Sequence, residues 1–330
     1  MLKSSSLKQL RAKKNLLAFS AGVDSSALFF ILLQNKIEFD IAIVNYNTRK
    51  QSQDELAYAE ELASAHKLIC HSLNAEMIEK NFEAQAREIR YSFFEELIAK
   101  HQYENLITAH HLGDRFEWML MQFCKGAGCA ELTGMQELQK RDNYTLARPL
   151  LHLDKQELLA FLETNRLKYF IDESNLDRDI KRNSFRHNYS SPLLEKYLSG
   201  IKKSFEYLDE DRDILINEVE IHRVGEFAYF KSSKNIRNDI FTLDKYLKSK
   251  QYMLSANERE LLKNETTLVV GRKFVVNQEF DFVFIAPFTE FKVMPKEFKE
   301  KMRLLKIEPK LRTYLFDNED AAKVITQLLS

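Results

Sequence analysis

Residues 20–25 read Ser-Ala-Gly-Val-Asp-Ser and carry residue types that could hold phosphate. They lie between two apolar runs, residues 15–19 and 27–33, an order that is typical of a buried strand, a loop and a helix start. Unpaired N–H groups at a helix start bind anions, and Gly22 has no Cβ to keep a ligand from the backbone. Asp24 adds a carboxylate that could bind a phosphate-bridging Mg²⁺. An ordinary strand-to-helix turn, capped by Asp24 or by the serine after it, would give the same pattern.

A second segment, residues 108–118, places Asp114 and Glu117 three positions apart, after the histidines His110 and His111. On a helix this spacing brings both carboxylates to one face of the first turn. Such a pair could bind Mg²⁺ or a cationic substrate, or act as a base. Acidic residues also cap helix N-termini, and adjacent histidines are often one core and one surface side chain. These residues alone leave both interpretations open.

Two further segments each place two arginines about one helical turn apart: Arg87 with Arg90, and Arg182 with Arg186. Two guanidinium groups on one helix face could bind a phosphate of a nucleotide or of an RNA backbone. A solvated helix face with Glu/Arg pairs, or a charged linker, would show the same spacing. The arginine pairs therefore carry weight only together with the other segments.

The elements that must position these residues follow an alternating pattern. We expect strands at residues 40–46, 68–73 and 105–108, helices at 52–66, 81–100, 114–124 and 154–165, and an irregular stretch at 126–148. Strands that alternate with helices predict an α/β fold, a doubly wound parallel sheet with helices on both faces. Ligands of such sheets bind beyond the carboxyl ends of the strands. Residues 20–25, 45–49 and 108–114 all fall at such ends, so one crevice would collect them.

A chain of 330 residues is longer than one hydrophobic core usually serves, which predicts two domains. We expect a catalytic domain over residues 1–190, a linker helix over 191–215 and a smaller α+β domain over 216–330. Positive and negative residues number 49 each, so overall charge indicates no particular partner. The longest apolar run is too short for a bilayer, no signal-peptide core precedes the first strand, and the three cysteines lack a disulfide-type spacing. We therefore expect a cytoplasmic protein without a membrane partner.

The first segment is similar to the pyrophosphate loop of the N-type ATP pyrophosphatases, the PP-loop superfamily, which reads Ser-Gly-Gly-x-Asp-Ser. Together, the four segments resemble the tRNA(Ile)-lysidine synthetase family. Residues 44–49, 126–134 and 148–151 add to the resemblance, which covers about residues 15–190 in the family's order and spacing. Three positions depart from the family pattern: Ala21 replaces a glycine, Gly113 replaces the first of two adjacent aspartates, and Tyr46 replaces a histidine.

The resemblance implies an adenine nucleotide alpha hydrolase-like fold and an ATP-dependent ligase that forms a carbon–nitrogen bond. Such an enzyme attaches L-lysine to C2 of the wobble cytidine of tRNA(Ile) through an adenylated cytidine, and releases AMP and pyrophosphate. By the same resemblance, ATP and Mg²⁺ are the expected co-substrate and metal, and Asp24 is the expected metal ligand. The implied pyrophosphate-binding residues are Ser20, Ala21, Gly22, Val23, Asp24 and Ser25.

The resemblance also implies roles for the other segments. Asp114 and Glu117 would receive the lysine ammonium, and His110 would contact the α-phosphate or orient the nucleotide. Arg182, together with Arg87, would stabilise phosphate charge. The basic stretch at residues 292–312 would dock tRNA phosphates or form a solvated surface. The sequence leaves the oligomeric state open, a homodimer included.

Two other functions fit parts of the sequence. A tRNA thiolase would keep the ATP loop, but Cys124 and Cys129 are not in C-x-x-C spacing and Cys70 is isolated, which favours structural cysteines. A nucleotide- or RNA-binding module without activity would fit the departures at Ala21 and Gly113. Such a module would bind ATP or tRNA without releasing pyrophosphate.

Overall fold

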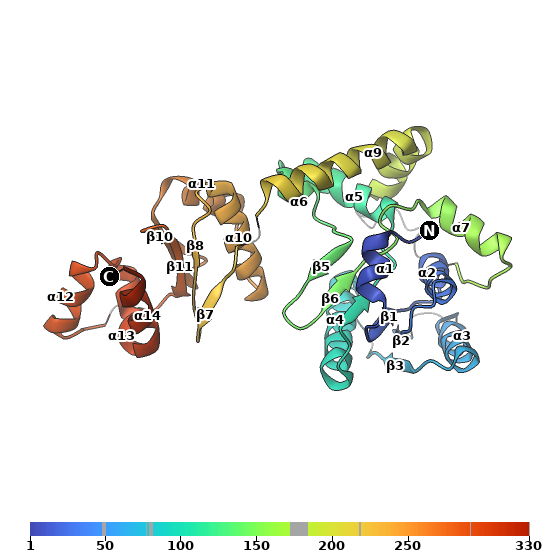
Figure 1. Cartoon of the computed structure of the whole chain (residues 1–330), viewed down its shortest axis with the longest axis horizontal. Coiled ribbons are helices and arrows are strands. Elements are labelled where there is room, and N and C mark those ends of the chain that lie inside the picture. The colour runs from blue at the N-terminus through green and yellow to red at the C-terminus, as the bar shows by residue number, and fades with distance from the viewer. Residues whose placement is uncertain are drawn as a thin grey trace. The chain divides into compact units, whose positions relative to one another are not determined.

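The computed structural model describes residues 1–47, 51–76, 78, 82–171, 184–217, 219–290 and 292–329. The chain divides into two compact units, Met1–Asp209 and Glu210–Ser330 (Figure 1). Each unit has its own sheet and its own hydrophobic core. Among the described residues no helix combines the length and the apolar character that crossing a membrane requires.

The first unit alternates strands and helices over most of its length. In chain order its elements are α1 (Ser4–Leu10), β1 (Asn15–Ala18), α2 (Val23–Gln34), β2 (Asp40–Asn45), α3 (Gln51–His66), β3 (Cys70–Asn74), α4 (Phe82–His101), β4 (Asn105–Ile107), α5 (Leu112–Phe123), α6 (Cys129–Leu132), β5 (Leu138–Lys140), β6 (Thr145–Ala147), α7 (Lys155–Thr164), a π-helical turn η2 (Arg186–Ser190) and α9 (Ser191–Leu215).

The sheet of this unit has the order β3-β2-β1-β4-β6-β5. Strands β1, β2, β3, β4 and β6 run parallel, and Leu16 at the centre of β1 pairs with Asp40 on one side and Leu106 on the other. The chain winds from β1 toward β3 and then returns to place β4 on the other side of β1. The carboxyl ends of β1 and β4 therefore flank the point where the winding reverses, which is where ligands bind in open α/β sheets.

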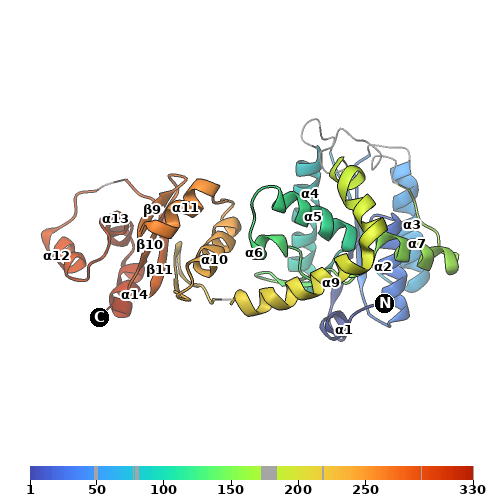
Figure 2. The same ribbon diagram turned by 90° about the horizontal axis from the view of Figure 1, so that it is seen from above.

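Helices cover both faces of this sheet, as Figures 1 and 2 show. On one face α2, α3 and α7 contribute buried side chains such as Phe29, Tyr58 and Leu158. On the other face α4 contributes Phe94 and Leu97. Strand residues alternate between the two clusters, since successive side chains of a strand point to opposite faces. The predicted doubly wound α/β fold is confirmed.

Residues 126–148, which we expected to be irregular, contain α6 and a hairpin of β5 and β6. The prediction was wrong because each strand has only three residues, too few to show an alternating pattern. The edge strand β5 also runs antiparallel to β6, so the sheet is not parallel throughout. The hairpin lies beside β4 and becomes part of a pocket described below.

Helix α5 packs on α9 within the first unit. Leu112 and Phe116 of α5 and Leu194 and Phe205 of α9 form a small apolar cluster, and Arg115 pairs with the Asp209 carboxylate. This contact holds the first turns of α5 against α9. Its first turn faces the carboxyl ends of the strands.

The second unit contains a five-stranded antiparallel sheet of order β7-β8-β11-β10-β9. Its elements are β7 (His222–Val224), β8 (Phe227–Lys231), α10 (Ile236–Ser249), α11 (Ala256–Asn264), β9 (Thr267–Val270), β10 (Phe274–Glu279), β11 (Phe282–Pro287), α12 (Lys296–Leu304), α13 (Pro309–Asp317) and α14 (Glu319–Leu329). Helices α10 and α11 pack on one face of this sheet, and α12, α13 and α14 pack on the other. Adjacent strand residues point to opposite faces, so Val276 belongs to the first core and Val275 to the second.

Candidate functional site

The loop between β1 and α2 is held open by hydrogen bonds among its own serines. The Ser20 N–H donates to Ser25 Oγ at 3.2 Å, and Ser25 Oγ donates to the Gly22 carbonyl at 3.2 Å. Ser26 Oγ donates to the Ala21 carbonyl at 3.1 Å, so the carbonyl groups of the loop are drawn inward. The first N–H groups of α2 have no intrahelical partner by geometry and remain for an anion.

Gly22 caps α2 and keeps the space above the loop clear. A Cβ built at Gly22 would stand in that space, 3.7 Å from Ser20 Oγ. Phosphate oxygens approach the backbone most closely where no side chain intervenes, so this position suits glycine.

Ala21 occupies the left-handed backbone region with φ of 57°, which explains the glycine of the related motif. The alanine costs about 1–2 kcal/mol of backbone strain at this φ. Its side chain is fully buried in the apolar core beside residues such as Leu28. The Cβ therefore points away from the space above the loop and does not close it to phosphate.

Asp24 lies in the first turn of α2, where burial of one of its carboxylate oxygens costs free energy. Its side chain is about one-third exposed, yet Oδ1 is buried and has no hydrogen-bond partner within the described part of the chain. Burial raises the pKa of Asp24, and His111 and Lys155 oppose that rise. A buried, unpartnered carboxylate oxygen at a phosphate-binding helix start fits Mg²⁺, which takes one or two carboxylates and completes its shell with phosphate and water.

The loop after β4 places His111 next to Asp24. His111 is 6% exposed, and its Nε2 lies 3.8 Å from Asp24 Oδ2 and 3.6 Å from Asp114 Oδ2. His111 Nδ1 also accepts the Gly113 N–H at 2.9 Å, while Asp114 accepts the His111 N–H at 3.0 Å. This reciprocal capping fixes the first turn of α5 against the phosphate loop. His110, the histidine singled out from the sequence, hydrogen-bonds Thr108 through Nδ1 at 2.9 Å.

Arg186 neutralises the carboxylate pair of α5. Its Nε donates to Glu117 Oε2 at 2.9 Å, and one terminal nitrogen lies 3.3 Å from Asp114 Oδ1. Glu117 is 1% exposed and Asp114 is 8% exposed. From its spacing we considered Arg186 for phosphate binding, but its guanidinium binds these carboxylates instead. Two buried carboxylates on one helix face need a positively charged partner. This requirement, read from the spacing of Asp114 and Glu117, could have predicted the contact with Arg186.

Gly113 is required by the position of the His111 ring. A Cβ at Gly113 would stand 2.6 Å from His111 Cε1 and 3.0 Å from Nδ1. An aspartate at this position, as in the family pattern, would force the imidazole out of its place between Asp24 and Asp114. A glycine at position 113 therefore leaves the space in which the His111 ring caps α5.

The structure does not bring every predicted residue to this cluster. Arg87 stacks on the Tyr91 ring, with its guanidinium carbon 4.7 Å from the ring centroid, and lines a separate pocket on α4. Arg182 lies outside the described residues. Tyr46, at the end of β2, donates through its hydroxyl to the Ala86 carbonyl at 2.8 Å and so ties the strand to α4.

Comparison with known proteins agrees with this geometry. A family model described as PP-loop domain matches residues 2–193. A tRNA(Ile)-lysidine synthase of Helicobacter pylori is 43% identical over 314 residues, covering 94% of this chain and 91% of the relative. One of Wolinella succinogenes is 43% identical over 309 residues, covering 93% and 94%. The chain belongs to the tRNA(Ile)-lysidine synthase family. The resemblance inferred from the four segments is confirmed.

Among solved structures, the U34-tRNA thiolase NcsA from Methanococcus maripaludis is similar in fold, with a TM-score of 0.51 at 16% identity, covering 66% of this chain and 80% of the thiolase. At this identity the likeness concerns the fold alone. The cysteines of the present chain do not favour a thiolase. Cys70, Cys124 and Cys129 form no disulfide within the described residues, and burial raises the pKa of Cys70 to about 11, which makes it a poor nucleophile.

Ala21→Gly tests whether the alanine of the loop obstructs the site. Relief of about 1–2 kcal/mol of left-handed strain is opposed by about 0.5–1 kcal/mol of glycine entropy and by about 0.8 kcal/mol of lost methyl burial. We expect unfolding free energy within about 1 kcal/mol of wild type and pyrophosphate release within about twofold. Unfolding can be followed by the fluorescence of Trp118, the single tryptophan. A large gain in activity would mean that Ala21 does obstruct phosphate, and Ala21→Val should be strongly destabilised.

Asp24→Asn should separate stability from activity. Because the folded-state pKa of Asp24 is raised, folding favours its protonated form, and the stability it contributes falls as pH rises through that raised pKa. At neutral pH the variant should therefore melt at a higher temperature than wild type while losing pyrophosphate release. The difference in melting temperature should shrink as pH is lowered through the raised pKa. A variant that melts earlier at neutral pH would contradict the unpaired-charge interpretation.

Proposed function

We propose that this chain attaches L-lysine to C2 of the wobble cytidine of tRNA(Ile), with ATP as co-substrate and Mg²⁺ as the metal. The observation that carries the proposal is the junction of the phosphate loop with the carboxylate pair, through His111 at 3.8 Å from Asp24 and 3.6 Å from Asp114. Membership of the tRNA(Ile)-lysidine synthase family gives this junction its chemistry. ATP, lysine and tRNA occur together in the cytoplasm, and we infer that the chain acts there.

The first half of the reaction uses the loop of residues 20–25. The cytidine O2 attacks the α-phosphate of ATP, the bond from the α-phosphate to the bridging oxygen breaks, and pyrophosphate leaves. The free N–H groups at the start of α2 would hold the departing pyrophosphate, and Asp24 would hold Mg²⁺, which supplies positive charge for the developing oxyanions. Adenylation turns the O2 atom into a good leaving group. His110, which hydrogen-bonds Thr108 at the end of β4, would orient the nucleotide.

The second half uses the first turn of α5. The lysine ε-nitrogen attacks C2, the bond between C2 and O2 breaks, AMP leaves, and the nitrogen loses a proton. Asp114 and Glu117 place two carboxylates on one face of the first turn of α5, and Asp24 lies on the other side of His111, so the site offers carboxylates to a cation. We infer that the lysine ammonium binds at these carboxylates and that Asp114 helps to remove its proton. Arg182 keeps its proposed role toward phosphate charge, whereas Arg87 lies in the separate pocket on α4.

Pyrophosphate release with ATP, lysine and tRNA, each omitted in turn, tests the proposed function. Release should depend on a tRNA with a wobble cytidine, and that tRNA should gain the mass of lysine less water. A tRNA that gains sulfur instead would support a thiolase. Binding of ATP and tRNA without any release would support a module without activity.

Asp114→Asn should strongly lower lysine incorporation and leave ATP binding nearly unchanged. The asparagine oxygen still accepts the His111 N–H and keeps the cap, but the charge that faces the ammonium is lost. A charge-assisted hydrogen bond contributes about 1.5–3 kcal/mol, which predicts a fall in turnover of about 10- to 100-fold or more. Glu163→Gln, an exposed carboxylate on α7, is the control and should match wild type. Near-normal turnover by the Asp114 variant would remove this carboxylate from the mechanism.

We also propose that the second unit holds the body of the tRNA. A pocket of about 660 Å³ opens between α12 and α13, lined by Met294, Lys296, Lys299, Glu300, Arg303, Pro309 and Arg312. Arg303 pairs with Glu300, and Arg312 donates to a backbone carbonyl. Within the described ranges Lys296 and Lys299 form no ion pair. Their charge is therefore available to RNA phosphates.

The double variant Lys296→Gln/Lys299→Gln should weaken tRNA binding and lower its salt dependence. Each lost phosphate contact removes about 0.9 from the slope of log affinity against log salt, so the double variant should lose about two. Fluorescence anisotropy with labelled tRNA at several salt concentrations measures this slope. Lys323→Gln on α14 removes an exposed lysine paired with Glu319 and serves as the control. An unchanged slope would exclude this pocket from tRNA binding.

A further inference from the structure

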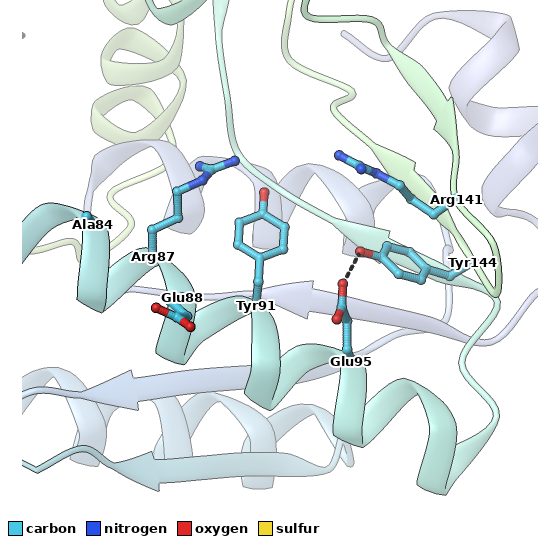
Figure 3. Close-up of a pocket in the computed structure, with 7 residues that line it drawn as sticks. All are labelled: Ala84, Arg87, Glu88, Tyr91, Glu95, Arg141 and Tyr144. Atoms are coloured by element: carbon cyan, nitrogen blue, oxygen red, sulfur yellow. Dashed lines mark hydrogen bonds between the residues drawn. The ribbon is translucent and has the colours of Figure 1, made fainter. Parts of the chain in front are cut away.

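A pocket on the α4 face of the first unit lies apart from the phosphate loop. It has a volume of about 310 Å³ and is formed by α4 and the β5–β6 hairpin (Figure 3). Its lining residues are Ala84, Arg87, Glu88, Tyr91, Glu95, Arg141 and Tyr144. Two guanidinium groups and two phenol rings are the groups that bind phosphate and stack on bases in nucleic-acid sites.

The two arginines of the pocket converge. Figure 3 shows the guanidinium groups of Arg87 and Arg141 reaching toward each other from α4 and from the hairpin, with the Tyr91 hydroxyl between and below them. Arg87 is held in this pose by the Tyr91 ring, 4.7 Å from the guanidinium carbon to the centroid. Like charges that point at one space without a counter-ion favour an anion in that space.

The acidic residues of the pocket do not neutralise these arginines. In Figure 3 the carboxylates of Glu88 and Glu95 lie on the other side of the Tyr91 ring from the guanidinium groups. Glu95 accepts the Tyr144 hydroxyl at 3.3 Å. Over the described residues neither Arg87 nor Arg141 forms an ion pair. The positive charge at this end of the pocket is therefore uncompensated.

Arg148 adds a third positive charge behind the pocket. It is 7% exposed, donates to Gln136 and Gln139, and leaves its Nε buried without a partner in the described part of the chain. Burial, together with the nearby Arg141 and Arg87, lowers the pKa of Arg148 to about 10, and Tyr91 opposes this effect. A buried cation surrounded by other cations is costly, and a bound anion would relieve that cost.

We propose that Arg87, Tyr91 and Arg141 form a subsite for a backbone phosphate of the RNA strand whose base is modified at the phosphate loop. This inference rests on the proposed function, since it assumes that an RNA strand enters the crevice. Strand β6 leads from the hairpin turn beside the pocket to Arg148 at the carboxyl edge of the sheet, the edge on which the phosphate loop lies. Arg148 directly follows Ala147, whose carbonyl accepts the Thr108 N–H at 2.9 Å, and Thr108 begins the loop that carries His110.

A phosphodiester fits this pocket better than a second nucleotide triphosphate. The pocket is open to one side and offers converging donors for a single anionic group, and its Tyr91 and Tyr144 rings are aromatic surfaces beside that group. An RNA strand supplies a phosphate next to each base, whereas ATP places its phosphates on the loop of residues 20–25. The subsite would thus hold the strand next to the reacting cytidine.

Arg141→Gln tests the subsite, with Lys140→Gln as the matched control. Lys140 is the next exposed cation of the same hairpin, but its side chain does not line the pocket. We expect the Arg141 variant to weaken binding of an RNA stem-loop carrying the anticodon about tenfold, with a salt slope smaller by about one. The KM for tRNA should rise by a similar factor, while kcat and the KM values for ATP and lysine stay unchanged. Arg141→Lys should recover part of the affinity, since it keeps the charge but loses the two-pronged contact.

The outcomes separate this inference from the proposed function. If wild type forms lysidine and Arg141→Gln binds the stem-loop like Lys140→Gln, the subsite is wrong and the proposed function stands. A rise in the KM for ATP, or in the inhibition constant of added pyrophosphate, would assign the pocket to the nucleotide and overturn the RNA assignment. If wild type releases no pyrophosphate with tRNA and lysine, the proposed function fails, whereas stem-loop binding still reports on the subsite. Trp118 fluorescence verifies that the variants are folded.

Discussion

The contact on which the rest of this site depends is the buried charge cluster between the phosphate loop and α5. Asp24, Asp114 and Glu117 put three carboxylates into one crevice, where His111 lies near Asp24 and Asp114, and Arg186 contacts Asp114 and Glu117. Buried carboxylates without full compensation are costly, so the surrounding structure must hold them there. In the proposed reaction Asp24 would hold Mg²⁺, and Asp114 and Glu117 would receive the ammonium group.

The sheet supplies the rigidity that this cluster requires. The phosphate loop follows β1 and the His111 loop follows β4, and these neighbouring parallel strands pair residue by residue. Because both loops leave adjacent strands at the same edge, small shifts of one relative to the other would break several backbone hydrogen bonds. Helix α5 is held near its start by its apolar contact with α9 and by the pair of Arg115 and Asp209. The acidic first turn of α5 is therefore held at a fixed distance from Asp24.

The structure of this site explains two of the departures from the family pattern. Ala21 adopts the positive φ that glycine would adopt, and its methyl group is buried in the core rather than above the loop. Gly113 leaves room for the His111 ring, which a side chain at that position would displace. The features that kept a module without activity in consideration thus have local structural explanations.

The sequence alone determined the fold class of the first unit, because apolar runs of strand and helix length alternate from residue 15 to residue 124. It also located the residues that end β1 and begin α2 and α5, because Gly22, Asp24, Asp114 and Glu117 stand at boundaries that apolar patterning marks clearly. It did not reveal the β5–β6 hairpin, whose strands of three residues are too short to carry a period.

Only the tertiary structure decided which of these residues meet. Sequence spacing relates residues within one helix, whereas Asp24 and His111 are 87 positions apart and meet because β4 inserts beside β1. The same reason explains Arg186, whose spacing suggested phosphate but whose contacts are Asp114 and Glu117, and Arg141, whose hairpin brings it opposite Arg87. Contacts between distant segments follow from strand order and packing, and no local pattern of residue types encodes them.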